Sequence, residues 1–412
     1  MKRDTLYSVI LILLGLSLLN LSCKKNTIQP DIEKTVILPV NASGIIQSNT
    51  DFAFDFLHTT LLNDVAPSNK MISPLSIYMA LSMLYNGSNN ATKDSIQFAL
   101  RLNNSSAAYL NNTCSALLQQ LPLADNAVNL SIANSIWYDQ TLRPLQSFLN
   151  VNDSFYKAQI QALNFNDPSS VTTINNWVSQ QTKGNINKII DKLSGIELYL
   201  INAIYFKGSW EYAFDKSLTA TASFKNGSGN NVTTSFMSLK RTFNYLENDS
   251  AQIIQLPYGG GGFNMYVMLP GSDIQVTQLA NLLNSSLFAK WQSQMDSTKV
   301  QLYLPKFQYS YSINNMQPEL TTMGMGIVFT KAADFTNLYS MGAQVGSAIH
   351  KIYISVDESG TVATAVTAIG IITTVARNPY EMNVNKPFLY VIQEKSTGLI
   401  LFIGIVNDPT QS

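Results

Sequence analysis

The sequence has few cysteines, few histidines and little charge. Of its 412 residues two are Cys and two are His, and Asp, Glu, Lys and Arg together make up 13%, about half the usual share. Cys23 lies close to the amino terminus, so Cys114 is the one thiol of the main body, which excludes an intrachain disulfide and a cysteine-based metal site there. His58 and His350 are too few for a typical zinc hydrolase and leave few options for a Ser–His nucleophilic site. We therefore expect no metal and no cofactor.

The charges that are present do not cluster. Lys plus Arg equals Asp plus Glu at 26 each, and no basic run is longer than "CKKN". Binding to nucleic acid therefore has no electrostatic support, and we expect no such partner. Hydrophobic residues make up 46% of the chain, enough for a large core. Between Asp51 and Asp408 there is no repeat or long linker, which favours one large domain.

The amino-terminal residues differ from the rest. Lys2 and Arg3 precede an apolar run from Val9 to Leu19, and "NLSC" follows, which is typical of an export signal. The ending in Cys23 resembles a bacterial lipoprotein signal, in which that cysteine is lipidated. We expect a signal peptide over 1–22, a lipidated cysteine and tether over 23–42, and the main domain over 43–412. The alternative is an uncleaved anchor.

Either interpretation of the amino terminus implies export. The expected location is the bacterial cell envelope, with a lipid anchor in the outer membrane or at the cell surface, and release from the cell is a further expectation. An exported domain without disulfides depends on its hydrophobic core for stability.

Helical patterns come first along the chain and strand patterns later, which predicts an α+β fold. The stretch "SPLSIYMALSMLYNGS" is apolar nearly all round and predicts a buried helix closed by Asn86–Gly87. "TTINNWVSQQTKGNINKII" predicts an amphipathic helix that stops at Gly184. The run "FLYVIQEKSTGLILFIGIV" predicts a hairpin that turns at Thr397–Gly398.

Two short motifs suggest chemistry but have simpler explanations. Gly259–Gly262 could cradle a phosphate, yet these glycines join two predicted strands and no helix follows, which favours a hairpin turn. "SFYK" at Ser154–Lys157 matches the S-x-x-K of penicillin-binding enzymes, but no K-T-G follows in a strand. So short a match arises easily by chance, and it is a weak alternative.

A long strand-like segment lies near the carboxyl terminus. Eleven of the eighteen residues in the charge-free window from Ser359 to Ala376 are Val, Ile or Thr, which favours β-structure. The window is too short and too rich in Thr for a membrane span, and too long for an ordinary buried strand. Its composition is also the reverse of a disordered linker.

Seven stretches in the same order resemble motifs of the serpin family: "MISPLSIYMALSMLYNGS", "INNWVSQQTKGNINKII", "LINAIYFKGSWEYAF", "IQLPYGGGGFNMYVMLPG", "YLPKFQYSYS", "AIHKIYISVDESGTVATAV" and "NVNKPFLYVI". The resemblance covers nearly everything from Asp51 to Pro409. It implies about eight to nine helices around three β-sheets, with an exposed reactive loop near the carboxyl terminus. It also implies an inhibitor of serine proteases, extending to cysteine proteases as a second expectation, and not an enzyme. After cleavage, the loop of a serpin inserts into the central sheet as a strand and drags the acyl-linked protease with it.

The residues of the loop suit insertion. Alternate side chains of a strand point to opposite faces, and from Thr361 to Thr367 one face carries only Thr and Ala. The loop has no proline between Thr361 and Pro379, and no charge would need burial. Val362 departs from the Glu common in the family, but it lies on the outward face. By resemblance, the hinge comprises Glu358, Gly360, Thr361, Ala363, Ala365 and Thr367.

Other roles also follow from the resemblance alone. Lys306 is the expected ion-pair partner of Glu358 at the top of the sheet, a region called the breach, and Trp210 covers the same opening. A polar cluster beneath the central strands, called the shutter, is expected from Ser73, Ser76, Asn202 and His350. There His350 would hydrogen-bond across the gap that opens on insertion, and near-neutral pH could bias it.

The family's spacing from Glu358 places the reactive bond at Thr374–Val375, which suits an elastase-like or broad-specificity protease. The distance to "NKPF" is about two residues longer than usual, so a shifted register would make Arg377–Asn378 the bond and trypsin-like enzymes the target. The expected partners are a serine protease and, through Cys23, a membrane lipid. The chain is expected to be a monomer without a heparin-type activator. A non-inhibitory serpin that binds a partner or is merely cleaved is the alternative.

Overall fold

The computed structural model describes residues 34–103, 105–193, 198–340, 344–346, 348–361 and 380–411. They belong to one unit of the chain, Ile32–Ser412. Within these residues the α-helices are α2 (Ala42–Asn63), α3 (Pro74–Tyr85), α4 (Asn90–Ala99), α5 (Ala107–Gln120), α6 (Gln146–Tyr156), α7 (Ser169–Gln181), α8 (Val276–Leu282), α9 (Ser285–Ser293) and α10 (Gln317–Leu320). A π-helical turn, Thr321–Met325, and a 3-10 turn, Gly326–Phe329, follow α10 directly.

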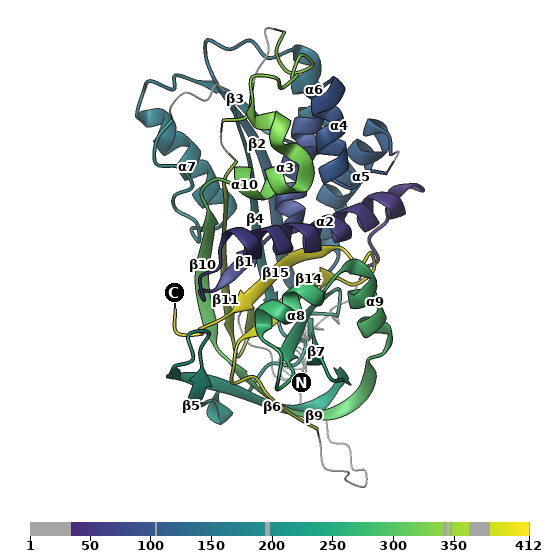
Figure 1. Cartoon of the computed structure of the whole chain (residues 1–412), viewed down its shortest axis with the longest axis vertical. Coiled ribbons are helices and arrows are strands. Elements are labelled where there is room, and N and C mark those ends of the chain that lie inside the picture. Colours follow the sequence, from purple (N-terminus) through teal and green to yellow (C-terminus); the bar gives the residue numbers. More distant parts are fainter. Residues whose placement is uncertain are drawn as a thin grey trace, which may run out of the picture. The chain divides into compact units, whose positions relative to one another are not determined.

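A six-stranded sheet carries the loop segment described below. Its order is β10 (Phe307–Ile313), β11 (His350–Asp357), β12 (Gly360–Thr361), β4 (Leu198–Ser209), β2 (Val128–Asp139) and β3 (Gln159–Leu163). All neighbours are antiparallel except β2 and β3. Helix α7 lies against the β2–β3–β4 side of this sheet (Figure 1).

The remaining strands form a nine-stranded sheet in two parts that share the long strand β6 (Asn231–Glu247). One part contains β1 (Lys70–Ile72), β15 (Ile400–Val406), β14 (Phe388–Glu394), β8 (Phe263–Pro270) and β7 (Ala251–Tyr258). The other contains β5 (Ala220–Lys225), β9 (Asp296–Pro305) and β13 (Tyr380–Asn383). These two parts and the six-stranded sheet are the three sheets predicted from the sequence.

Local sequence signals explain several elements. The Ser73 side chain accepts a hydrogen bond from the Ser76 amide, and Pro74 occupies the first turn, so α3 begins there. Every residue of α3 except Ala80 is buried, as its apolar pattern predicts. Gly184 takes a φ of 81° after α7, and Gly398 takes 75° in the turn between β14 and β15. Both are left-handed values that glycine adopts without strain.

The hydrophobic core has two separate clusters. The larger one lies between the two sheets and extends into the helices around α3. The smaller one joins α7 to the outer face of β2 and β4 through Trp137, Ile174, Trp177, Tyr199, Ile201 and Ala203. In the described part of the chain, no helix has the length and hydropathy needed to cross a membrane.

Candidate functional site

The segment expected to be a hinge forms the short strand β12 at one end of the six-stranded sheet. Gly360 pairs with Asp357 of β11 and Ser209 of β4, and Thr361 pairs with Val356 and Gly208. The Thr361 hydroxyl lies 2.7 Å from the Tyr258 hydroxyl in a fully buried hydrogen bond. The loop therefore enters the sheet in a defined register.

Only glycine fits at position 360. Its φ is 139°, and a Cβ atom there would lie 2.1 Å from the carbonyl oxygen of Gly208. No side chain tolerates that approach, because the obstacle is backbone of the neighbouring strand. The start of β12 thus depends on close backbone packing against β4.

The carboxylate of Glu358 is held on both sides. Lys306 Nζ lies 2.9 Å from Oε2, and the Thr219 hydroxyl donates to Oε1 at 2.8 Å. Burial alone would raise the pKa of Glu358, but the hydrogen bonds from Lys306, the backbone and Thr219, with the lysine charge, outweigh it and lower the pKa. The predicted ion pair is present, and the carboxylate stays ionised.

Trp210 closes this end of the sheet. Its backbone amide donates to the Ser359 carbonyl, and its indole Nε1 donates to the Asp357 carbonyl, both at 2.9 Å. Its ring stacks on Tyr258 with 4.4 Å between centroids and 14° between planes. Trp210 and Tyr258 thus fasten both sides of the hinge, and the sequence had pointed only to Trp210.

The four-glycine stretch proves to be a turn between β7 and β8, as expected. The buried carboxylate of Asp125 accepts from the amides of Gly260 and Gly262 at 2.8 and 3.1 Å. A phosphate would have to displace this carboxylate and meet its charge, so the phosphate interpretation is wrong. The Gly259 amide donates to the Ser209 carbonyl at 2.8 Å, which ties the turn to the end of β4.

Beyond β12, the described part of the chain places no further strand between β4 and β11. Within the described residues, no strand pairs with the facing edges of β4 from Leu198 to Lys207 and of β11 from His350 to Ser355. Because β12 is antiparallel to both, β4 and β11 run parallel to each other. We call the space between these two edges the slot. Edges with unpaired backbone groups are a template for a further strand.

The connector after α7 covers part of the slot. Thr182, Asn185 and Ile186 line a small cavity of about 10 Å³ together with residues of β4, β11 and Thr361. Lys351 Nζ donates to the Lys188 carbonyl at 2.9 Å. A strand that entered the slot would have to push this connector aside.

Three of the four expected cluster residues meet at the far end of the slot. The Ser73 amide donates to His350 Nε2 at 3.0 Å, and the Ser73 hydroxyl donates to the Leu401 carbonyl at 2.8 Å. The Ser76 amide donates to the Ser73 hydroxyl at 3.3 Å. Burial lowers the pKa of His350 to about 3. The expectation that near-neutral pH influences the hydrogen bonding of His350 is therefore wrong, because the imidazole stays neutral throughout that pH range.

Asn202 lies on the other side of the slot. Its Nδ2 donates to Asn134 Oδ1 at 2.7 Å, whereas its buried Oδ1 has no partner among the described residues. The expected hydrogen bond from His350 across the gap is not formed, since His350 bonds to Ser73 instead. Asn134 was missed by the sequence analysis, which had no signal for a pairing between β2 and β4.

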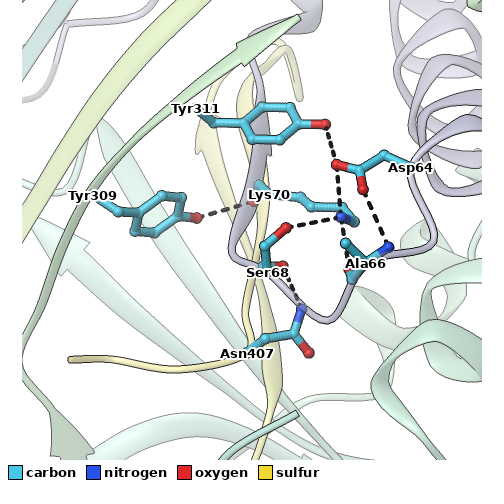
Figure 2. A network of polar contacts seen from close by, with 7 residues as sticks. All are labelled: Asp64, Ala66, Ser68, Lys70, Tyr309, Tyr311 and Asn407. Atoms are coloured by element: carbon cyan, nitrogen blue, oxygen red, sulfur yellow. Dashed lines mark hydrogen bonds and ion pairs between the residues drawn. The ribbon is translucent and has the colours of Figure 1, made fainter. Parts of the chain in front are cut away.

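An ion pair between a buried lysine and a half-buried aspartate anchors the opposite side of the sheet (Figure 2). Lys70 Nζ lies 2.8 Å from Asp64 Oδ2 and donates to the Ala66 carbonyl at 2.9 Å. From β10, the Tyr311 hydroxyl donates to Asp64 Oδ2 at 3.1 Å, and the Tyr309 hydroxyl donates to the Lys70 carbonyl at 3.0 Å. Strand β10, and β11 paired with it, are thereby tied to β1 and the end of α2.

Residues 47–409 match the family model described as serpin (serine protease inhibitor). This chain belongs to the serpin family. Plasma serine protease inhibitor from Homo sapiens is 33% identical, with 90% of this chain and 92% of that protein covered. Serpin-Z7 from Hordeum vulgare is 31% identical over 84% of this chain and 91% of its own length. The native structure of the thermophilic serpin tengpin has a TM-score of 0.82 and 32% identity, covering 92% of this chain and all of that one.

Family membership confirms the α+β serpin fold and supports protease inhibition in general. Several predicted serpin sites lie outside the described residues: Cys23, Ala363, Ala365, Thr367, Thr374, Val375, Arg377 and Asn378. No group of three or more His, Cys, Asp or Glu that could hold a metal occurs in the described chain.

The other motifs of this serpin have structural explanations. Ser154 and Lys157 are both exposed at the end of α6, where Lys157 takes a left-handed φ of 51°, and Asn152 and Asp153 carbonyls accept from its amide. This is a helix end and not an enclosed nucleophile. His58 Nε2 donates to the Ala280 carbonyl at 3.1 Å, a packing role for α2 against α8.

Proposed function

We propose that this serpin traps serine proteases by inserting its cleaved loop into the slot. The observation that carries the proposal is β12, because two residues of the loop already pair with both walls of the slot. Because the start of the loop is already in register, the loop needs only to extend along the edges of β4 and β11, which can pair with a further strand.

The register of β12 defines how each later loop residue would pair. For every step forward in the loop, the partner moves back one residue on β4 and on β11. Ala363 would then lie opposite Phe206 and Ile354, and Ala365 opposite Ile204 and Ile352. These four partners belong to the larger hydrophobic cluster. The small loop residues would thus face the core, as the alternation in the sequence requires.

The same register would bring Thr367 opposite Asn202 and His350. Asn202 Oδ1 lacks a donor among the described residues, and a threonine hydroxyl can both donate and accept. Insertion would therefore give this buried acceptor a hydrogen-bond donor. An unpaired buried acceptor destabilises a structure by about 1–3 kcal/mol, and insertion would remove that cost. This supports an inserted state that is more stable than the open one.

We further propose Thr374–Val375 as the reactive bond and an elastase-like or broad-specificity protease as the target, with Arg377–Asn378 and a trypsin-like target as the alternative. Purified residues 24–412 should be mixed separately with proteases of both types. A complex that survives boiling in detergent, with cleavage after Thr374 shown by mass spectrometry of the released peptide, supports the proposal. Clean cleavage without a complex would make the protein a non-inhibitory serpin.

The setting remains a separate proposal. The sequence from Lys2 to Cys23 supports a lipid anchor in the bacterial envelope, where a tethered inhibitor would protect the cell from foreign proteases. Mass spectrometry of the mature amino terminus tests it. An acylated Cys23 is the expected result, and an unmodified mature terminus would rule the anchor out.

A further inference from the structure

A cavity of about 430 Å³ lies at the far end of the slot. Helix α3, the first residues of β4, the segment before β11 and the turns after α10 surround it. Its wall is mainly apolar, with Leu81, Leu84, Leu198, Leu200, Val328 and Leu338 among the lining residues. The volume falls in the range of roughly 300–1,000 Å³ that is typical of small-molecule sites.

Five polar side chains line this cavity, those of Ser76, Asn202, Lys331, Gln344 and His350, and two of them, Asn202 and His350, lie on the strands that bound the slot. Asn202 Oδ1 is a buried acceptor without a partner among the described residues. His350 accepts from the Ser73 amide at Nε2, so the neutral ring carries its proton on Nδ1, for which the described chain offers no acceptor. On these two strands the cavity therefore presents one acceptor and one donor.

Part of the wall can adapt. Met316 and Met325 line the cavity, and thioether side chains repack easily around a ligand. Met325 belongs to the π-helical turn, in which Gly324 has a φ of 96°. Such turns interrupt the regular helical hydrogen bonds. This side of the cavity can therefore change shape more readily than α3 or β4.

We propose that the cavity binds a small neutral apolar alcohol. Its hydroxyl would donate to Asn202 Oδ1 and accept from His350 Nδ1, and its hydrocarbon part would contact the leucines. A carboxylate cannot donate to Asn202 Oδ1, so it would leave that acceptor unpaired. An amine at neutral pH carries a charge and has no acceptor lone pair for His350.

Occupancy would also regulate the protein, a consequence that rests on the proposed function. The alcohol would occupy the place that the register assigns to the Thr367 hydroxyl. It would thus bind the form with an open slot and not the inserted form, and a ligand stabilises the state that it binds. Alcohol in the cavity would therefore hold the loop out and reduce protease trapping.

The first test measures binding to the full chain without protease. Hexan-1-ol is compared with its isomer pentyl methyl ether, which has the same atoms but no hydroxyl hydrogen, by calorimetry or by NMR shifts. We expect saturable binding of the alcohol and at least tenfold weaker binding of the ether. Equal affinity for the two probes would overturn the proposal.

Two substitutions locate the site. Ala80→Leu fills the cavity from α3 and should abolish alcohol binding, and Ala333→Leu fills the facing wall as a second variant with the same expectation. Ala222→Leu adds the same volume at an exposed position of β5 and should leave binding unchanged. If both filled variants fold and bind as tightly as the natural chain, the alcohol binds elsewhere and the inference fails.

A protease assay separates this inference from the proposed function. Binding that Ala80→Leu abolishes, in a protein that traps no protease, would support the site and refute the inhibitor. Protease trapping in a protein that does not bind hexan-1-ol would support the inhibitor and refute the site. With both present, the alcohol should lower the yield of complex in the natural chain but not in Ala80→Leu.

Discussion

A pair of glutamate substitutions at adjacent loop positions tests the insertion register directly. Ala363→Glu would place a carboxylate between Phe206 and Ile354, which are 7% and 4% exposed. Val362→Glu would place the same charge on the other face, opposite Lys207 and Ser355, which are both half-buried. Because strand side chains alternate, a shift of one position moves the charge from the core face to the outer face.

The expected difference between the two variants is large. Burial of an unpaired ion costs several kcal/mol, so we take about 4 kcal/mol for Ala363→Glu, and each 1.4 kcal/mol is a factor of about ten. Insertion would slow by up to about 1,000-fold, so the acyl-enzyme would be hydrolysed before the loop could insert. Val362→Glu has the half-buried Lys207 as a neighbour, and an ion pair on this outer face changes stability by only about 0–1 kcal/mol.

The assay is the number of inhibitor molecules consumed per protease molecule inactivated, together with the fraction of protease in a denaturant-stable complex. Ala363→Glu should be cleaved as a substrate with almost no complex, and Val362→Glu should resemble the natural chain. Equal loss of complex in both variants, or full trapping by Ala363→Glu, would refute the register.

Three further outcomes are expected. Tyr258→Phe removes the hydroxyl bonded to Thr361 and should lower the free energy of unfolding by about 1 kcal/mol, measured by denaturant unfolding, while the yield of protease complex should not change, because the register keeps Thr361 in place on insertion. Because the pKa of Glu358 is lowered, its ion pair with Lys306 stabilises the fold at pH values above the ordinary pKa of 4.5. This stabilisation is lost as the pH falls through the lowered pKa, and Glu358→Gln should remove this acid dependence of the melting temperature. His350 has a pKa of about 3, against an ordinary value of 6.5. The free energy of unfolding should therefore fall as the pH drops from 6.5 toward 3, because only the unfolded state gains a proton in this range. His350→Gln should make the free energy of unfolding less dependent on pH there, and an unchanged dependence would contradict the neutral buried ring.

Local chemistry made part of the molecule predictable. The apolar run closed by Asn86–Gly87 predicted α3, Gly184 marked the end of α7, and Gly398 marked the turn between β14 and β15. The small residues that alternate from Thr361 predicted a core-facing side of the hinge, and the burial of Thr361 at 3% agrees. In each case a few neighbouring residues determine the conformation, so a short stretch of sequence contains the signal.

The remaining features depend on pairs of residues that are far apart in the chain. Asp125 accepts from amides 135 and 137 residues away, and no local pattern selects that carboxylate. The partner of His350 depends on how closely α3 approaches β11. Resemblance to a family was enough to name the residues of the polar cluster. The edges of β4 and β11 that no described strand pairs with depend on the spacing between strands, which the identity of the residues alone does not determine.

The anchor in Figure 2 gives the six-stranded sheet one fixed side and one free side. Tyr309 and Tyr311 tie β10 and β11 to the main body by hydrogen bonds, whereas β2 and β4 contact it through apolar side chains such as Ile204 and Phe206 and share a second cluster with α7 on their outer face. In native-state hydrogen exchange these would be two units with different opening free energies. Substitutions that strengthen the anchor can therefore raise global stability without slowing the motion of the free side. Under the proposed mechanism, thermal stability and speed of inhibition could then be tuned independently.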